Sequence, residues 1–317
     1  MTGRTGRTGR TGRTGRKDDE AGGKAFRRVS DELRVRIADG GYPLGTELPS
    51  QNALAQEFGV SRFTVQRVLT ELGNEGWIES QQGKRSRVVR NQRIHSAAPR
   101  ASRSRHPMTL GPLIAEAFER DEVTLDIYTL TSESLDTHIH AQAERIRARI
   151  IAPERIALRM VLPSPSIIEL LPYPRGKDPA DDARLLDRLR GITGRHTASL
   201  HKVLGELRTE KLVESVEYEF RHVSLAPSFK LYVINGEEVL HGTYTPVERP
   251  VMLETGEEID AVDVLGLGAT LTHHVRDGRP DSPGTTFVDK MTGWFEGVWT
   301  LLTDEARAHA IASAHAG

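Results

Sequence analysis

The sequence predicts a multi-domain α+β protein: an N-terminal unit of three helices and a β-hairpin, then a larger α/β domain with a mixed sheet. Hydrophobic residues recur at helical spacing in residues 25–90, whereas predicted strands and helices alternate beyond residue 108. The charge divides in the same way. Residues 1–105 hold 21 Lys and Arg against 11 Asp and Glu, and residues 106–317 hold 22 against 33. A basic block joined to an acidic one indicates that the N-terminal part meets a polyanion.

Composition divides the chain into four segments. Residues 1–24 are predicted to be a disordered basic tail, because five copies of Thr-Gly-Arg over residues 2–16 bury nothing that could offset ordering entropy. The tail either holds phosphates without reading sequence or is a tolerated low-complexity expansion. Residues 91–107 contain Arg, Ser, Ala and Pro and are predicted to be a basic linker. The folded parts are then residues 25–90 and residues 108–317.

The first folded part begins with a helix, since Phe26, Val29, Leu33 and Ile37 recur at helical spacing. Two shorter helices follow, with Ser50 and Ser61 as their predicted N-caps. The tight turn Gly59-Val60 separates these two helices. Residues 77–80 and 87–90 are predicted to be strands around a basic turn. This order of elements is that of a winged helix-turn-helix.

A helix-turn-helix places its second helix in the major groove of double-stranded DNA, while the first helix crosses the backbone. The leading edge of the second helix then faces the bases, where Arg pairs with guanine and Gln with adenine. The basic hairpin is expected to contact the minor groove or its phosphates. The alternative is a three-helix core with no role in DNA binding. The predicted DNA-binding residues are Ser50, Gln51, Asn52, Ser61, Arg62, Thr64, Gln66, Arg67, Gly83, Lys84, Arg85 and Arg87.

A dense motif supports this interpretation. The run Gly41-Tyr42-Pro43-Leu44-Gly45-Thr46-Glu47-Leu48-Pro49-Ser50, then Phe58-Gly59-Val60-Ser61-Arg62 and Glu75-Gly76-Trp77-Ile78, resembles the winged-helix domain of the GntR family of bacterial regulators. The resemblance covers roughly residues 25–90. It implies a cytoplasmic homodimer that binds an operator with an inverted repeat, usually a repressor, modulated by a small-molecule effector.

Two positions depart from the family pattern. The family often has Arg where this chain has Asn52, and it usually has Arg where this chain has Gln66, whereas Arg62 is kept. Because Arg and Gln pair with different bases, the operator is expected to differ from the common half-site at a position normally read as guanine.

The second domain is predicted to be α/β. The Asn235-Gly236 pair is a strong hairpin signal and excludes the all-helical effector domain common in the family. The β-rich, sugar-responsive effector domain stays open, although it is usually shorter. Strands are predicted at residues 123–130, 155–162, 216–224, 229–234 and 238–245, and helices at residues 134–150, 197–211 and 286–302.

Residues 227–242 resemble the active-site hairpin of phospholipase D-like proteins, whose motif is His-x-Lys followed by Asp. This chain has Ser228, Lys230 and Asn235 at the corresponding positions, so only the lysine is kept. Without the imidazole no phosphohistidine can form, and no enzymatic activity is expected by that route. The resemblance implies a degenerate domain reused to sense an anionic small molecule near Lys230. Alternatively, Ser228 and Lys230 only cap and solubilise a strand.

Other chemistry has little support in the sequence. The chain has no cysteine, which excludes disulfides and thiolate zinc sites. No metal-ligand spacing, Ser-His-Asp arrangement or phosphate loop stands out, so no metal and no cofactor are predicted. No apolar run approaches the roughly 20 residues of a membrane span. Two alternatives to a regulator remain: a DNA-associated phosphodiesterase-like enzyme and an architectural dimer without a ligand.

Overall fold

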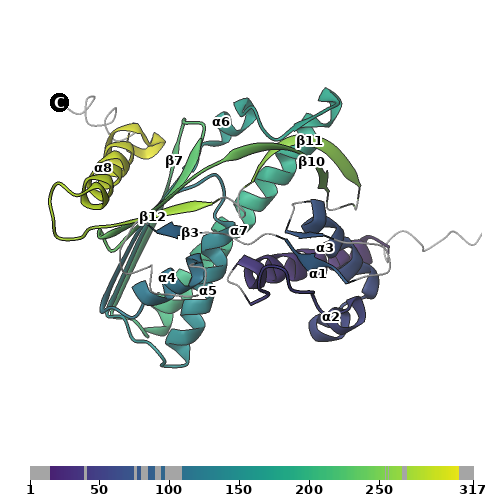
Figure 1. The fold of residues 1–317 in the computed structure, drawn as a ribbon, viewed down its shortest axis with the longest axis horizontal. Helices are drawn as coiled ribbons and strands as arrows, with labels where there is room; N and C mark the ends of the chain where they lie inside the picture. The colour runs from purple at the N-terminus through teal and green to yellow at the C-terminus, as the bar shows by residue number, and fades with distance from the viewer. Residues whose placement is uncertain are drawn as a thin grey trace, which may run out of the picture.

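The computed structural model describes residues 15–38, 41–74, 77–79, 85–89, 94–96, 109–253, 255, 257–265 and 270–306. It shows a small helical unit packed beside a larger α/β domain (Figure 1). Residues 1–14 of the predicted tail, the hairpin residues Gly83 and Lys84, and residues 97–107 of the predicted linker lie outside the described residues. Among the helices of the described part, none is long and apolar enough to cross a membrane.

The N-terminal unit has the predicted order of helices and hairpin. Its elements are α1 (Gly15–Ala38), α2 (Gln51–Phe58), α3 (Arg62–Asn74), β1 (Ile78–Glu79) and β2 (Arg87–Val88). The Ser50 hydroxyl accepts a hydrogen bond from the Ala53 amide at 3.2 Å and starts α2. Gly59, with φ of 62°, ends α2 in the left-handed conformation. The core contains Leu33, Leu54, Val65, Leu72 and Trp77.

Two predicted segment boundaries are wrong. Helix α1 begins at Gly15, so residues 15–24 are helical rather than part of a disordered tail. Within the predicted linker, β3 (Ile94–Ser96) pairs in parallel with β12 (Leu271–Val275). Ile94 is buried in the main core, and this burial holds the short strand at the edge of the sheet.

The C-terminal domain is built on a seven-stranded mixed sheet in the order β3-β12-β9-β8-β4-β5-β7. Strands β4, β5 and β7 run parallel, whereas β8 and β9 form an antiparallel hairpin beside β4. Asn235 and Gly236 both have positive φ and close this hairpin, as predicted. The remaining strands of the sheet are β4 (Glu122–Tyr128), β5 (Arg155–Pro163), β7 (Ser215–Val223), β8 (Phe229–Ile234) and β9 (Glu238–Thr243).

Helices cover both faces of this sheet (Figure 1). On one face lie α4 (Leu110–Ala117), α5 (Glu133–Arg147) and α7 (Asp182–Glu210), which pack on inward side chains of β4, β5 and β8. On the other face lies α8 (Pro283–Gly297), continued by a π-helical turn over Val298–Leu302. The sequence predicts a helix at residues 197–211 and a helix start at Asp181-Asp182, but it does not join them into one helix, since Gly191 and Gly194 lie between them. Burial of Leu185, Leu186 and Leu189 stabilises the first half.

A second, smaller sheet extends from this domain towards the N-terminal unit. It has the order β10-β11-β6, with β10 (Thr245–Met252), β11 (Glu258–Leu265) and β6 (Arg175–Gly176). Helix α6 (Pro165–Leu170) and a 3-10 turn at Pro179–Asp181 connect the strands to α7. Helix α7 has 29 residues and is therefore about 43 Å long. It contributes to the main core at one end and reaches the N-terminal unit at the other.

A buried polar cluster, here called the domain junction, joins the two units through Arg34, Glu71, Glu133, Arg188 and Met252. Glu71, on α3, is 1% exposed. Its carboxylate accepts hydrogen bonds from Arg188 at 2.8 Å and from the Met252 amide at 3.2 Å. Arg34, on α1, lies 3.7 Å from Glu71 and donates to Glu133 at 3.2 Å. The Met252 side chain packs into the core of the N-terminal unit.

Replacing Glu71 should therefore destabilise the junction. In Glu71→Ala the buried guanidinium groups lose their carboxylate, which is expected to lower the free energy of unfolding by about 3 kcal/mol. The matched control is Glu169→Ala, since Glu169 pairs with Arg190 at 2.9 Å but its side chain is 65% exposed. That change should cost below about 1 kcal/mol. Urea unfolding of both variants measures the difference, and equal shifts would contradict a structural role for Glu71.

Candidate nucleic-acid interface

Helix α3 has one buried and one exposed face. Val65, Val68 and Leu72 are fully buried against α1 and α2, whereas Arg62, Phe63 and Gln66 are exposed. The exposed residues lie in the first two turns, the part of a recognition helix that meets base edges. The structure thus presents Arg62 and Gln66 together on one free face.

The start of α3 is organised by its own hydroxyl groups. Ser61 Oγ accepts a hydrogen bond from the Thr64 amide at 3.1 Å and lies 2.9 Å from Thr64 Oγ1. This is an N-cap, and it fixes the direction in which the helix leaves the turn. A helix N-terminus also attracts phosphate oxygens. Ser61 and Thr64 therefore position the helix, and Ser61 remains exposed to an incoming ligand.

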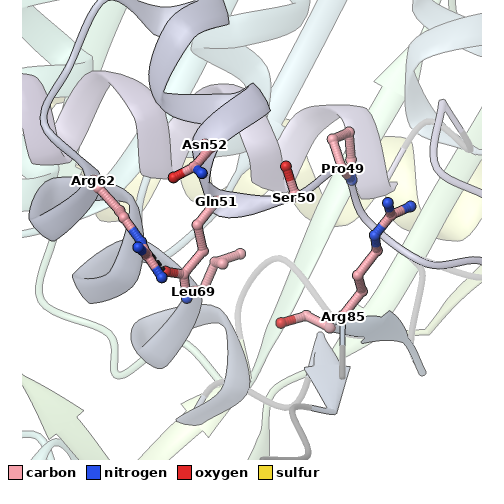
Figure 2. Close-up of a pocket in the computed structure, with 8 residues that line it drawn as sticks. Pro49, Ser50, Gln51, Asn52, Arg62, Leu69 and Arg85 are labelled. Carbon is pink, nitrogen blue, oxygen red and sulfur yellow. Dashed lines mark hydrogen bonds between the residues drawn. The ribbon is translucent and has the colours of Figure 1, made fainter. Parts of the chain in front are cut away.

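A hollow of about 310 Å³ lies between the two helices and the hairpin. Arg62 Nε donates to Gln51 Oε1 at 3.2 Å on one side, and Arg85 lies across the hollow near the start of β2 (Figure 2). Polar and basic groups thus line an open surface whose shape and charge suit a polyanionic backbone. The lining residues are Pro49, Ser50, Gln51, Asn52, Arg62, Leu69, Arg85 and Ser86.

The remaining predicted DNA contacts divide into two groups. Asn52 on α2 and Arg87 on β2 are exposed on their elements. Arg67 differs, because its guanidinium lies 4.8 Å from the centroid of the Phe26 ring and the residue is half-buried. That cation–π contact joins α3 to α1 and gives Arg67 a packing role.

Phe63 is a residue of this face that the sequence analysis omits. Its side chain is 68% exposed, although it is one of the largest apolar residues of the unit. The signal was present in the sequence, since Phe63 falls outside the buried pattern of Val65, Val68 and Leu72. An apolar side chain between Arg62 and Thr64 can contact the methyl group of thymine.

The three predicted effector residues do not form one site. Ser228 is exposed before β8, and Asn235 closes the hairpin at the other end, roughly 23 Å away along the strand. The Asn235 side chain accepts a hydrogen bond from the Thr124 amide at 2.8 Å, which ties the hairpin to β4. Lys230 is 2% exposed, on the face of the sheet that α5 covers. Burial lowers the pKa of Lys230 to about 7.

Comparison with known proteins relates the N-terminal unit to a protein family. Residues 26–88 match the model described as bacterial regulatory proteins, gntR family. The chain is 34% identical over 91 residues to an uncharacterized HTH-type transcriptional regulator of Rhizobium meliloti, which is 29% of this chain and 36% of the relative. It is 39% identical over 70 residues to the mannosyl-D-glycerate transport/metabolism system repressor of Escherichia coli, covering 22% and 29%.

Two further matches have a similar extent. The Glc operon transcriptional activator of Escherichia coli is 37% identical over 71 residues, which is 22% of this chain and 28% of the relative. A solved GntR family transcriptional regulator from Listeria monocytogenes matches at 25% identity and a TM-score of 0.20, over 20% of this chain and 56% of that chain. The chain thus spans little more than a third of the first curated relative and less than a third of the other two.

The family match falls on the helices and hairpin whose geometry is described above. It includes the capped turn, the recognition helix and both described strands of the hairpin. The predicted resemblance is confirmed for this part of the chain: residues 26–88 form a winged helix-turn-helix domain of the GntR family of bacterial regulators.

Proposed function

We propose that the whole chain is a sequence-specific transcription regulator that binds operator DNA as a homodimer. The observation that carries this proposal is the free face of α3, where Arg62 and Gln66 are exposed beside the hollow that Gln51 and Arg85 line. With α3 in the major groove, these side chains reach base edges. Two copies related by a two-fold axis would read the half-sites of an inverted repeat about one helical turn apart.

The C-terminal domain is proposed to receive a signal and pass it to the N-terminal domain. The supporting observation is the domain junction, where Glu71 of the recognition helix is hydrogen-bonded to Arg188 of α7. A ligand that binds one arrangement of the two domains better than another would shift the orientation of α3. The curated relatives include both a repressor and an activator. Repression is proposed here as the commoner outcome in the family.

We also propose that the C-terminal domain is a degenerate phospholipase D-like domain without enzymatic activity. Three parallel strands followed by an antiparallel hairpin, with Lys230 on β8, support the relationship. Ser228 replaces the histidine nucleophile of that family, and a serine hydroxyl needs an adjacent base to attack phosphorus. Its observed hydrogen bond is made through its backbone carbonyl, to the Tyr244 amide.

The proposed function is tested by footprinting the purified protein on the DNA upstream of its own gene. A protected inverted repeat is expected, with an affinity that falls by roughly 0.9 log units per log unit of salt for each neutralised phosphate. Salt-sensitive binding to all sequences alike, without a protected site, would show that the N-terminal unit contacts phosphates but does not recognise a base sequence. The regulator proposal would then fail.

Arg62 should be the strongest single determinant of specificity. Arg62→Ala removes an exposed side chain and leaves the core intact, so we expect a loss of about 1–3 kcal/mol in specific binding with little change in nonspecific binding. The matched control is Arg120→Ala, which removes the same charge from the C-terminal domain, where Arg120 pairs with Glu237 at 3.1 Å. Fluorescence anisotropy on operator and scrambled DNA gives both affinities. Unchanged specificity in Arg62→Ala would refute the assignment of α3.

Gln66 should determine the identity of one base in each half-site. Gln66→Arg replaces a side chain that pairs with adenine by one that pairs with guanine. Selection from a randomised operator library is expected to show a shift from adenine to guanine at one position and its symmetry mate. Thr70→Arg, one turn further along α3, is the control for added charge alone, because Thr70 is exposed. The same preference in both variants would show that charge, not base pairing, causes the change.

A further inference from the structure

Three metal-ligating side chains from three helices meet beside the domain junction. Asp31 lies on α1 of the winged-helix domain, Glu133 begins α5, and His196 lies in the middle of α7. One ligand atom from each residue lies within 4.8 Å of the ligand atoms of the other two. Among the described residues, this is the one group of three or more His, Cys, Asp or Glu side chains that could hold a metal ion. Glu133 and His196 follow Asp31 by 102 or more positions in the sequence, so only the packing of the two domains brings the three side chains together.

The imidazole of His196 is placed like that of a metal-bound histidine, with a carboxylate beside one ring nitrogen and no partner on the other. The residue is 6% exposed, and its Nδ1 lies 2.8 Å from Asp136 Oδ2. Its Nε2 is buried and has no hydrogen-bond partner in the described structure. A buried ring nitrogen without a partner costs free energy. A carboxylate on the opposite nitrogen is the usual partner of a metal-bound histidine, because it fixes the tautomer and raises the basicity of the ligand.

The two carboxylates of the cluster lie close together around one cation, Arg34. Ionised carboxylates held this close repel each other unless a cation lies between them. The Arg34 guanidinium bridges them, with NH1 at 2.9 Å from Asp31 and 3.2 Å from Glu133. Each carboxylate accepts further ligands on its remaining lone pairs. Arg34 also lies 3.7 Å from Glu71. Glu71 would therefore remain as a carboxylate partner for Arg34 if a metal ion bound between Asp31 and Glu133.

We propose that Asp31, Glu133 and His196 bind a divalent transition-metal ion, and that this ion ties the winged-helix domain to the C-terminal domain. Two carboxylates and one imidazole suit Zn²⁺ or Mn²⁺ and leave coordination positions for water. Because one ligand comes from α1 and two from the C-terminal domain, the complete site exists only when the domains are packed as observed. The ion would therefore act as an effector, and this regulatory part rests on the proposed function.

The site itself can be tested without DNA. The full chain, treated with EDTA and dialysed, is titrated with ZnCl₂ by calorimetry, and one tight equivalent per chain is expected. Asp31→Asn and Glu133→Gln keep side-chain shape and should each weaken this event by at least about 100-fold, since even outer-shell changes cost 10–100-fold. Asp187→Asn is the matched control, because Asp187 is on α7 with a side chain 74% exposed. Circular dichroism establishes that each variant is folded.

The outcomes distinguish the metal site from its role as an effector and from the proposed function. A tight event that is absent, or that persists unchanged in Asp31→Asn and Glu133→Gln, overturns the site and leaves Arg34 as the sole cation of the cluster. Operator affinity in EDTA tests the proposed function by itself. In the wild type, saturating Zn²⁺ should change that affinity by at least about fivefold, and Asp31→Asn should abolish the change. Equal affinity with and without bound Zn²⁺ overturns the effector role.

Discussion

The arrangement of the two domains depends on one buried carboxylate. Glu71 is on α3, the helix whose other face exposes Arg62 and Gln66, and its side chain is 1% exposed in the junction. A charge without solvent needs compensation from nearby cations and donors, and here Arg188 and the Met252 amide provide it from the C-terminal domain. Helix α3, the proposed recognition helix, is thereby fixed to the C-terminal domain. Because Arg188 lies on α7, the partner of Glu71 belongs to the same helix that packs into the main core of the C-terminal domain.

This junction consists mainly of ion pairs. Met252 is its apolar anchor, and the rest consists of ion pairs among Arg34, Glu71, Glu133 and Arg188. A buried ion pair contributes little net stability, but removing one of its partners is strongly destabilising. Arg34 lies between carboxylates of both domains, because it pairs with Asp31 and with Glu133.

The sequence predicts local structure well where a motif is contiguous and poorly where distant segments meet. The caps Ser50 and Ser61, the hairpin at Asn235-Gly236 and most strands of the main sheet follow from short-range signals. The first half of α7 and the strand β3 depend on tertiary burial, of Leu185 and Ile94 for example, and that burial overrides glycine and linker composition. The motif indicates Arg62 and Gln66, which are exposed, but it gives no sign of the exposed Phe63 or of the packing of Arg67 on Phe26. The cluster of Asp31, Glu133 and His196 has no spacing in the sequence that could reveal it.

Asn52 and Gln66 differ from the residues that the GntR family usually has at these positions, and the structure shows why this difference is compatible with the winged-helix fold. Both side chains are exposed, so neither contributes to the core that fixes α2 and α3. Positioning on the duplex comes from helix caps and basic groups, whereas base identity comes from a few side chains on one helix face. Such side chains can change without loss of fold, provided that the anchoring contacts stay. Glu71 and Arg67, on the same helix, are constrained by buried neighbours instead. Helix α3 therefore has the exposed side chains of Arg62 and Gln66 on one face and the buried contact of Glu71 with the second domain on the other.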